Sequence, residues 1–330
     1  MPKIVRFHQL GGPEVLKIEE QPSQQPKENE ARLRVQAIGL NRAESMFYHG
    51  QYLEEPQLPS RLGYEAAGIV DAVGPGVDKS WIGKRASSIP GFLMTQYGVL
   101  GEEAIVPVAM LGEYPDKLSA AEGAAIWMQY LTAWGALVHY GKIAKGDVAV
   151  LTAASSGVGL AAIEIVKDAG GIAIAATRGS KKRDELLAAG ADHVIATEEE
   201  DLVQRVKEIT AGKGARIIFD PIGGPIVEKL AEAAAYLGTI YEYGALSPEP
   251  TPFPLFTCLR MGLTVRAYTV RELLHDPEAL AAGKKYVYER LADGRFRPKI
   301  AETFPFAQTV EAYRYLESNA QVGKVVITVE

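Results

Sequence analysis

The stretch from Asp147 to Gly170 constrains the fold of this chain more than any other. It begins with the β-prone apolar run Asp147–Leu151, passes through small residues, and then places apolar side chains at a helical spacing as far as Ala169. This change from a continuous apolar run to a single apolar face predicts a buried strand, a tight turn and a helix. A second strand-like run, Ile172–Ala176, follows at once, as a dinucleotide-binding fold requires.

The turn between that strand and that helix, Ala153–Gly159, consists almost entirely of small residues. Small side chains let the backbone approach a pyrophosphate, whose charge then meets free amides and the positive end of the helix. The match to Gly-x-Gly-x-x-Gly is incomplete, because Ala154 and Ser156 stand where the first two glycines would be. Plain packing of a strand against a helix is the alternative reading. The residues expected to contact phosphate are Ser155, Ser156, Gly157, Val158 and Gly159.

The same alternation repeats downstream of this unit. Strand-like runs lie at Asp192–Ile195, Arg216–Phe219 and Gly238–Tyr241, and the helical patterns between them are Ser180–Ala189, Glu199–Ala211 and Pro225–Tyr236. Strands that alternate with helices at this spacing predict an α/β fold with a doubly wound parallel sheet. A further strand at Gly262–Tyr268 and a long helix at Pro277–Ala292 are predicted after it.

The first part of the chain is rich in strand-like runs, and no helical period is evident before about Ser119. The predicted strands are Ile4–Phe7, Leu16–Ile18, Ala31–Ala37 and Ala67–Val73, with extended chain continuing at Asp78–Arg85 and Glu102–Pro107. Ser119 and Glu122 form a capping-box pattern that opens an Ala-rich helical run to about Tyr140. The tail Gly323–Val329 is strand-like again. We therefore expect a β-rich domain at residues 1–121, completed by 297–330, and a dinucleotide-binding domain at 122–296.

Composition limits the classes of function. The chain has 330 residues and a net charge of -6, which argues against a general nucleic-acid surface. No apolar run approaches the roughly 20 residues that a membrane span needs, and the N-terminus lacks the pattern of a signal peptide. Cys258 is the only cysteine, so neither an intrachain disulfide nor a Cys-rich zinc site can form. A cytoplasmic location is expected.

Several short motifs spread from end to end carry a family resemblance: Gly39–Asn41, Gly50–Tyr52, Gly63–Val70, Gln129–Trp134, Ala153–Gly159, Ala188–Asp192 and Gly323–Val326. With this order of domains, the chain resembles the medium-chain dehydrogenase/reductase family, specifically its zinc-free quinone oxidoreductase branch. The resemblance implies a GroES-like β-rich catalytic domain and a Rossmann domain. It also implies NADPH-dependent hydride transfer to a quinone or an α,β-unsaturated carbonyl compound. Ser156 departs from that branch, which usually has glycine there.

Zinc-using relatives carry a cysteine shortly after the first of these motifs and a histidine in Gly-His-Glu. Here Asn41 and Arg42 occupy the first region, and Tyr64 stands at the histidine position. The five histidines are scattered, whereas catalytic zinc needs about three protein ligands. We therefore expect no metal, and hydride delivery to an already electrophilic acceptor is the chemistry that remains.

Candidate catalytic residues follow from the resemblance. Tyr52 matches a tyrosine that protonates or hydrogen-bonds the substrate in related enoyl reductases; otherwise it is an aromatic residue of a turn. Asn41 matches an asparagine near the nicotinamide, with a plain turn residue as the alternative. Tyr64 is expected to line the pocket either as a donor or as a plug.

The choice of cofactor depends on the end of the second strand, where NAD enzymes place an acidic residue. This chain has Thr177, Arg178, Ser180 and Lys182 in that region and no acid. Cations at the start of a helix oppose its dipole, so a 2′-phosphate partner, and hence NADPH, is favoured over a merely solvated basic turn.

The resemblance also places Gln129, Tyr130 and Thr132 in the bridging helix beside the cofactor, with helix capping as the alternative for the polar residues at its start. It places Tyr243 and Gly244 after the fifth strand, and Asn319 and Lys324 near the C-terminus, beside the cofactor as well, with plain surface positions as the alternative. Leu263–Tyr268 is expected to be an edge strand that pairs across a two-fold axis in a homodimer. The alternative to an enzyme is an NADPH-binding redox sensor or structural protein without turnover. A short-chain reductase is excluded, since no tyrosine has lysine four residues on.

Overall fold

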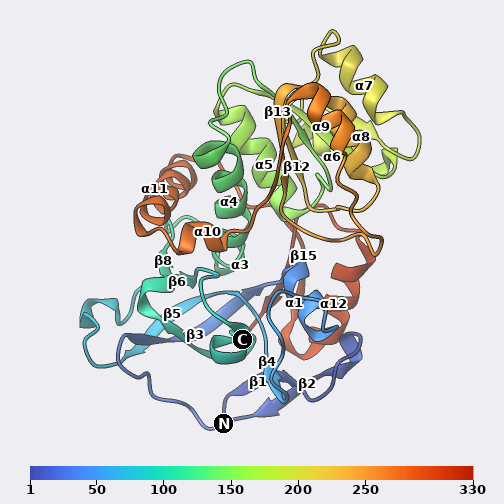
Figure 1. Cartoon of the computed structure of the whole chain (residues 1–330). Coiled ribbons are helices and arrows are strands. Elements are labelled where there is room, and N and C mark those ends of the chain that lie inside the picture. The colour runs from blue at the N-terminus through green and yellow to red at the C-terminus, as the bar shows by residue number, and fades with distance from the viewer. Residues whose placement is uncertain (330) are drawn as a thin grey trace. The chain divides into compact units, whose positions relative to one another are not determined.

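The structure, a computed structural model, describes residues 1–329 and divides into two compact units. Unit 1 comprises Met1–Met128 together with the segment that begins at Tyr288, and unit 2 comprises Gln129–Val287. The two boundaries fall within helices α4 (Trp127–Trp134) and α11 (Pro277–Asp293). The colours of Figure 1 follow the chain through both units.

Unit 2 is built on a six-stranded parallel sheet in the order β11-β10-β9-β12-β13-β14. Its strands are β9 (Val148–Leu151), β10 (Ile172–Thr177), β11 (His193–Ala196), β12 (Ala215–Asp220), β13 (Ala234–Glu242) and β14 (Thr264–Ala267). Strand order reverses between β9 and β12, and open sheets of this kind bind ligands at the carboxyl edge of that point. The predicted doubly wound parallel sheet is confirmed.

Helices of unit 2 lie between successive strands, and a short one follows β14. They are α5 (Gly157–Asp168), α6 (Arg183–Ala188), α7 (Leu202–Ile209), α8 (Ile226–Ala233), α9 (Leu255–Met261) and α10 (Arg271–Leu274). The helix predicted for Pro225–Tyr236 stops at Ala233, because Ala234 already pairs with Ala215 in the sheet. No helix in the described part of the chain is both long and apolar enough for a membrane span.

The single helical run predicted from Ser119 to Tyr140 is wrong in detail. It is divided into α3 (Ala120–Gly123), α4 and a wider π-helical turn, Gly135–Tyr140. The predicted capping box is confirmed: the Ser119 hydroxyl accepts from the Glu122 amide at 3.2 Å, and the Glu122 carboxylate accepts from the Ser119 amide at 2.8 Å. At Gly135 a side chain would lie 2.0 Å from the Tyr268 hydroxyl, so close tertiary packing begins where α4 ends.

Unit 1 contains a seven-stranded sheet and a three-stranded sheet. The larger sheet follows the path β15-β16-β3-β5-β6-β8 with β7 paired to β3, and the smaller has the order β2-β1-β4. The strands are β1 (Lys3–Phe7), β2 (Leu16–Glu20), β3 (Glu30–Gly39), β4 (Ser60–Arg61), β5 (Glu65–Val73), β6 (Arg85–Ser88), β7 (Glu103–Pro107), β8 (Leu111–Glu113), β15 (Ile300–Pro305) and β16 (Lys324–Thr328). Strand β16 pairs antiparallel with β3, so the C-terminal strand returns to the N-terminal sheet.

The expectation of no helix before Ser119 is wrong. Helix α1 (Arg42–Tyr48) and the short α2 (Met94–Tyr97) lie in unit 1, and Asp78–Arg85 contains a 3₁₀ turn where extended chain was expected. Helix α1 is too short to show a period, and its start is fixed by the Glu44 carboxylate, which accepts from the Asn41 amide at 3.0 Å. Strand β15 and helix α12 (Thr309–Ser318) were not predicted, and Figure 1 shows α12 beside α1.

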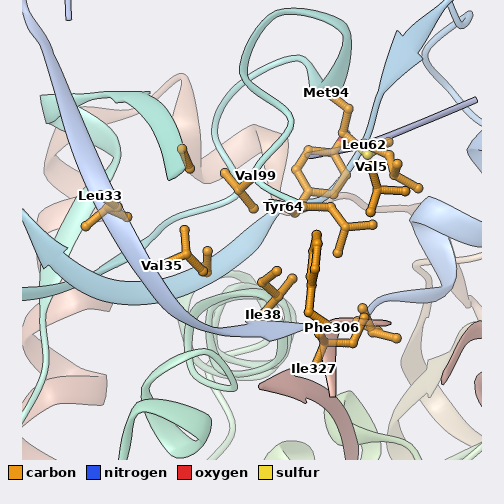
Figure 2. Close-up of a cluster of buried hydrophobic side chains, with 14 of the residues drawn as sticks. Val5, Leu33, Val35, Ile38, Leu62, Tyr64, Met94, Val99, Phe306 and Ile327 are labelled. Carbon is orange, nitrogen blue, oxygen red and sulfur yellow. The ribbon is translucent and has the colours of Figure 1, made fainter. Parts of the chain in front are cut away.

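The core of unit 1 is a continuous cluster of apolar side chains from distant segments. Figure 2 shows Leu33, Val35 and Ile38 of β3 together with Ile327 of β16 and the ring of Phe306. Tyr64 lies within this cluster and is 2% exposed. Leu33 and Val35 follow the alternation of a strand, and Ile38 returns to the core side after a register shift between Val35 and Ala37.

Candidate cofactor and active site

The small-residue turn of unit 2 joins β9 to α5 at the carboxyl edge of the sheet. Ser156 is the N-cap of α5, and its hydroxyl accepts from the Gly159 amide at 3.0 Å. Residues 155–158 are partly exposed, whereas Ala154 and Gly159 are buried. The turn is therefore open on the side where the first amides of α5 lack partners within the helix, as phosphate binding requires.

Two backbone features explain the small residues of the turn. Ala153 has a positive φ of 45°, and a side chain at Gly159 would lie 2.5 Å from the Ala154 carbonyl oxygen. The first turn of α5 thus presses on the preceding loop, which is the packing role of the last glycine in dinucleotide motifs. The Ser156 hydroxyl accepts a bond as a cap and still has its own proton to donate.

The basic residues predicted to hold a 2′-phosphate lie after β10. Thr177 ends that strand, and its carbonyl accepts from the Thr197 amide at 2.8 Å. Lys182 donates to the Ser155 hydroxyl at 3.1 Å, so this lysine reaches back to the small-residue turn before α5. Burial lowers the pKa of Lys182, and so does the positive charge of Arg178. An anion bound between Arg178 and Lys182 would stabilise the positive charges of both side chains.

Two acidic partners in this region were not foreseen from the sequence. The Glu199 carboxylate accepts from the Ser180 amide at 2.8 Å and so occupies part of the predicted phosphate site. Arg183, one of the cations in this run, is directed away, because it pairs with Glu200 at 2.7 Å and donates to the Val194 carbonyl at 2.8 Å. Arg183 is therefore not available to a ligand in this arrangement, whereas Lys182 lies beside Ser155 and the charge of Arg178 acts on it.

Tyr243 and Gly244 follow β13. The Tyr243 ring stacks on Phe219 with centroids 3.9 Å apart and an angle of 17° between the planes. Its hydroxyl is buried and faces Ser156; burial and the charge of Asp220 raise its pKa. A side chain at Gly244 would lie 2.7 Å from the Pro221 carbonyl, so the two loops at this edge are in contact. The structure thus brings Tyr243 next to Ser156 in the small-residue turn before α5.

Helix α4 carries further predicted cofactor residues. Gln129 and Thr132 are buried, and Gln129 Oε1 accepts no hydrogen bond from any residue between 1 and 329. Such a buried acceptor fits a polar ligand group that carries a donor. Tyr130 is directed elsewhere, because its hydroxyl donates to Glu164 of α5 at 2.6 Å.

In unit 1, Asn41 and Lys324 belong to one buried polar cluster. Lys324 Nζ lies 2.5 Å from Glu65 Oε2 and 2.6 Å from Asn41 Oδ1, and Glu65 Oε1 accepts from the Met128 amide at 2.8 Å. Lys324 is 5% exposed and Glu65 1% exposed. Glu65 was not predicted as a site residue, although it follows Tyr64 directly in the quoted motif. The cluster fixes the position of Asn41, whereas contact of Asn41 or Lys324 with a dinucleotide stays a proposal.

Glu44 extends this cluster toward the helices of unit 1. It accepts from the Asn41 and Tyr64 amides, both at 3.0 Å, and from the Tyr313 hydroxyl at 2.8 Å. Burial raises the pKa of Glu44, and these donors act in the opposite direction. The carboxylate ties α1 to α12 and to the chain at Tyr64, so it orders the loop that bears Asn41.

The remaining residues of unit 1 are the two candidate tyrosines and Asn319. Tyr52 is partly buried, and its ring lies 6.3 Å from that of Tyr64, which lies 5.9 Å from that of Phe92. Because Tyr64 is buried, a role in filling space in the pocket fits it better than a role as a hydrogen-bond donor to a substrate. Asn319 ends α12 with a positive φ of 55°, and its side-chain amide donates to the Glu317 carbonyl at 3.1 Å. No group of three or more His, Cys, Asp or Glu side chains within residues 1–329 is placed to hold a metal ion.

Comparisons with known proteins match both domains. A family model described as zinc-binding dehydrogenase matches residues 157–282, and one described as alcohol dehydrogenase GroES-like domain matches residues 27–132. Quinone oxidoreductase 1 of Escherichia coli (strain K12) is 32% identical over 325 residues, which are 97% of this chain and 97% of that protein. The synaptic vesicle membrane protein VAT-1 homolog of Rattus norvegicus is 28% identical over 96% of this chain and 82% of that protein.

Solved structures agree. Escherichia coli quinone oxidoreductase complexed with NADPH has a TM-score of 0.89 at 30% identity and covers 99% of each chain. A GroES-like domain joined to a six-stranded Rossmann-like sheet defines the class of medium-chain dehydrogenases and reductases. The chain belongs to the medium-chain dehydrogenase/reductase family, in its quinone oxidoreductase branch, and is an NAD(P)-dependent oxidoreductase of that type.

Proposed function

We propose that this protein is a zinc-independent, NADPH-dependent reductase of quinones or α,β-unsaturated carbonyl compounds. The observation that carries the proposal is the open phosphate turn of α5 with Lys182 bonded to its Ser155 hydroxyl at 3.1 Å. The relative from Escherichia coli that was crystallised with NADPH supports it. When bound, the reduced nicotinamide supplies the hydride, and an acceptor with a delocalised oxygen takes up the charge.

The residues of unit 2 fit a phosphorylated dinucleotide. The amides that begin α5 and the Ser156 hydroxyl would hold the pyrophosphate, and Arg178 with Lys182 would hold the 2′-phosphate. The 2′-phosphate of NADPH would lie between these two cations and offset their mutual repulsion. NADH has no 2′-phosphate and would leave that repulsion uncompensated. The Ser180 amide donates to Glu199 in this structure, so Glu199 must release it before Ser180 can contact the 2′-phosphate.

The proposed role of unit 1 is to orient the acceptor. Tyr52 would donate a hydrogen bond from its hydroxyl to the oxygen of the acceptor on which negative charge develops. Asn41 would fix the nicotinamide end, since its side chain is itself held by Lys324 and Glu65. Tyr64 would exclude water from the acceptor by filling space. These roles agree with the resemblance and with the rigid hydrogen-bond network around Asn41.

The test is to mix the protein with NADPH and a panel of quinones and enones and to follow the absorbance of the nicotinamide. Turnover with NADPH, and a drop of roughly tenfold or more in kcat for Tyr52→Phe, are the expected results, because that variant removes one donor to the developing charge. Tyr97→Phe is a matched control, since the Tyr97 hydroxyl bonds to Glu30 at 2.8 Å instead. No consumption of NADPH with any acceptor would refute the proposal.

Tight binding of NADPH without turnover would instead favour the second candidate, a redox sensor or structural protein. The two candidates share the dinucleotide site, so binding and turnover have to be measured separately. A cytoplasmic location, proposed from the single cysteine, is compatible with both.

We also propose a homodimer formed along β14. This strand ends the sheet, and the neighbouring surface of unit 2 is apolar: Phe256 is 83% exposed, Leu259 71%, Tyr236 69% and Leu237 66%. Exposed apolar patches beside an unpaired edge strand mark sites of association. A second copy that pairs along β14 would satisfy the strand edge and cover this patch.

A further inference from the structure

Two carboxylic acids stand side by side at the carboxyl edge of the sheet and have no role in the function proposed above. Asp220 is the last residue of β12 and Glu242 the last of β13, and the two are register partners in neighbouring parallel strands. Side chains at paired positions lie on the same face of a sheet, so these two carboxyl groups face each other.

Asp220 is surrounded by donors. The Thr152 hydroxyl, at the end of β9, donates to Oδ1, and the amides of Ile222 and Gly223 donate to Oδ2 at 3.1 and 2.7 Å. The bond from Thr152 crosses the point where the strand order reverses, between β9 and β12. Burial raises the pKa of Asp220, and these donors act in the opposite direction by stabilising its charged form.

Glu242 has the opposite surroundings. Both of its carboxyl oxygens are buried, and neither accepts a hydrogen bond from any donor in residues 1–329. The charged group that faces it is Asp220, so burial and the like charge together raise the pKa of Glu242 to about 9. Two carboxylates cannot both ionise in contact without a cation, and a proton between them turns repulsion into a hydrogen bond. That proton resides on Glu242, because Asp220 already accepts from other donors.

The pair lies beneath the loops at this edge of the sheet. The Asp220 carbonyl accepts from the Tyr243 amide at 2.8 Å, and the Ile222 carbonyl accepts from the Ser247 amide at 2.8 Å. Gly223 and Gly224 both have positive φ angles, of 65° and 66°, so this loop has a conformation that few other residues adopt. The loop therefore depends on Asp220 being held in one orientation.

We propose that Glu242 is a positioning residue that, as a neutral acid, donates a hydrogen bond to Asp220 and so holds the loop 221–224 and Tyr243 in the conformation that receives the nicotinamide half of the cofactor. This inference rests on the function proposed above. It assigns Glu242 no contact with the reacting atoms. Its effect passes through Asp220 and the loop.

Few other groups face the pair. From β9 it meets the uncharged Thr152, and on β14 the register partner of Glu242 is Ala267. Among the described residues, the Tyr243 hydroxyl is a titratable group near Asp220, and burial with the charge of Asp220 raises its pKa. Loss of a proton from the pair in alkaline solution is thus assigned to Glu242.

Ionisation of Glu242 removes the hydrogen bond and places two negative charges in contact. If only the protonated pair is competent, the dissociation constant of NADPH rises about tenfold for each pH unit above the midpoint, because the competent fraction falls by that factor. Glu242→Gln keeps a donor toward Asp220 at every pH. This variant is therefore expected to bind NADPH within about twofold of the unaltered protein at pH 7 and to lack the alkaline loss of affinity.

The experiment measures the dissociation constant of NADPH by calorimetry from pH 7 to pH 10 for the unaltered protein, Glu242→Gln and Glu249→Gln. Glu249 is an exposed residue of the following loop and serves as the matched control, which should keep the alkaline loss. Identical pH profiles for the unaltered protein and Glu242→Gln would overturn the proposal.

A second readout needs no cofactor. Infrared spectra of the ligand-free protein at pH 7 should contain the carbonyl band of a protonated carboxylic acid, which disappears as the pH is raised and is absent from Glu242→Gln. Absence of that band overturns this inference alone, whether or not NADPH binds. If the band is present but the protein binds no NADPH at any pH, the proposed NADPH-dependent function is wrong. The proposed positioning role of Glu242 is then refuted as well, because it depends on that function.

Discussion

The ion pair between Lys324 and Glu65 gives the sharpest test of the structure of unit 1. The perturbation is Lys324→Met, which keeps the length and apolar stem of the side chain and removes the ammonium group. Lys324 is 5% exposed and Glu65 1% exposed, and their charged atoms lie 2.5 Å apart. After the substitution, the donors to Glu65 within residues 1–329 would be neutral: the Met128 amide at 2.8 Å and the Asn41 side-chain amide at 3.3 Å.

The expected cost is large because a buried carboxylate would lose its counter-charge. Breaking one side of a buried pair costs about 3–5 kcal/mol, which is a fifth or more of the roughly 5–15 kcal/mol that stabilises a typical domain. Glu65→Met should cost a similar amount, since it leaves a buried ammonium. The double variant removes both charges of this pair. It loses the partner of the Met128 amide, worth about 1–3 kcal/mol, and the favourable charge of Lys324 near the buried Glu44, which the Lys324→Met single variant loses as well. The double-mutant cycle should therefore give a coupling energy of several kcal/mol.

The assay is urea unfolding followed by circular dichroism at pH 7 for the four proteins of the cycle. Lys167→Met is the matched control, because Lys167 pairs with Asp192 at 2.6 Å but the side chains are 40% and 31% exposed. An exposed pair of this kind contributes at most about 1 kcal/mol. If Lys324→Met cost no more than Lys167→Met, or if the double variant were as unstable as the sum of the single ones, the reasoning about burial would be refuted.

Three other predictions concern unit 2. Arg178→Ala combined with Lys182→Ala should raise the Michaelis constant for NADPH roughly a hundredfold or more but change that for NADH only a few-fold, and equal effects would show that the 2′-phosphate lies elsewhere. Between about pH 5 and pH 9 the free energy of unfolding of the unaltered protein should fall relative to that of Glu242→Gln by up to about 1.4 kcal/mol per pH unit. The reason is that glutamate in the unfolded chain releases its proton near pH 4.5, whereas Glu242 in the folded protein releases it near pH 9. Parallel stability curves for the two proteins would contradict the raised pKa. Phe256→Glu with Leu259→Glu should convert a dimer into a monomer in sedimentation experiments, and a monomeric unaltered protein at micromolar concentration would disprove the interface.

Local patterns in the sequence predicted much of the architecture. The change of period around Ala153–Gly159 and its repetition predicted the alternating strands and helices, because each element needs only its own residues to show a buried face. The same reasoning failed for α1, because this helix has seven residues and a helical period is recognised only over a window of about 11–18 residues. It also merged α3, α4 and the π turn into one helix, since Ala-rich segments lack local signals for where packing interrupts them.

The sequence by itself therefore determined the parallel sheet, the small-residue turn before α5, and the basic residues after the second strand, all of which depend on neighbours in the chain. Only the tertiary structure decided which charged groups meet. Lys324 and Asn41 are 283 positions apart, and Asp220 faces Glu242 because of the register between β12 and β13. The physical reason is that the burial and pKa of an ionisable group depend on partners brought together by strand pairing, and no local pattern specifies that pairing.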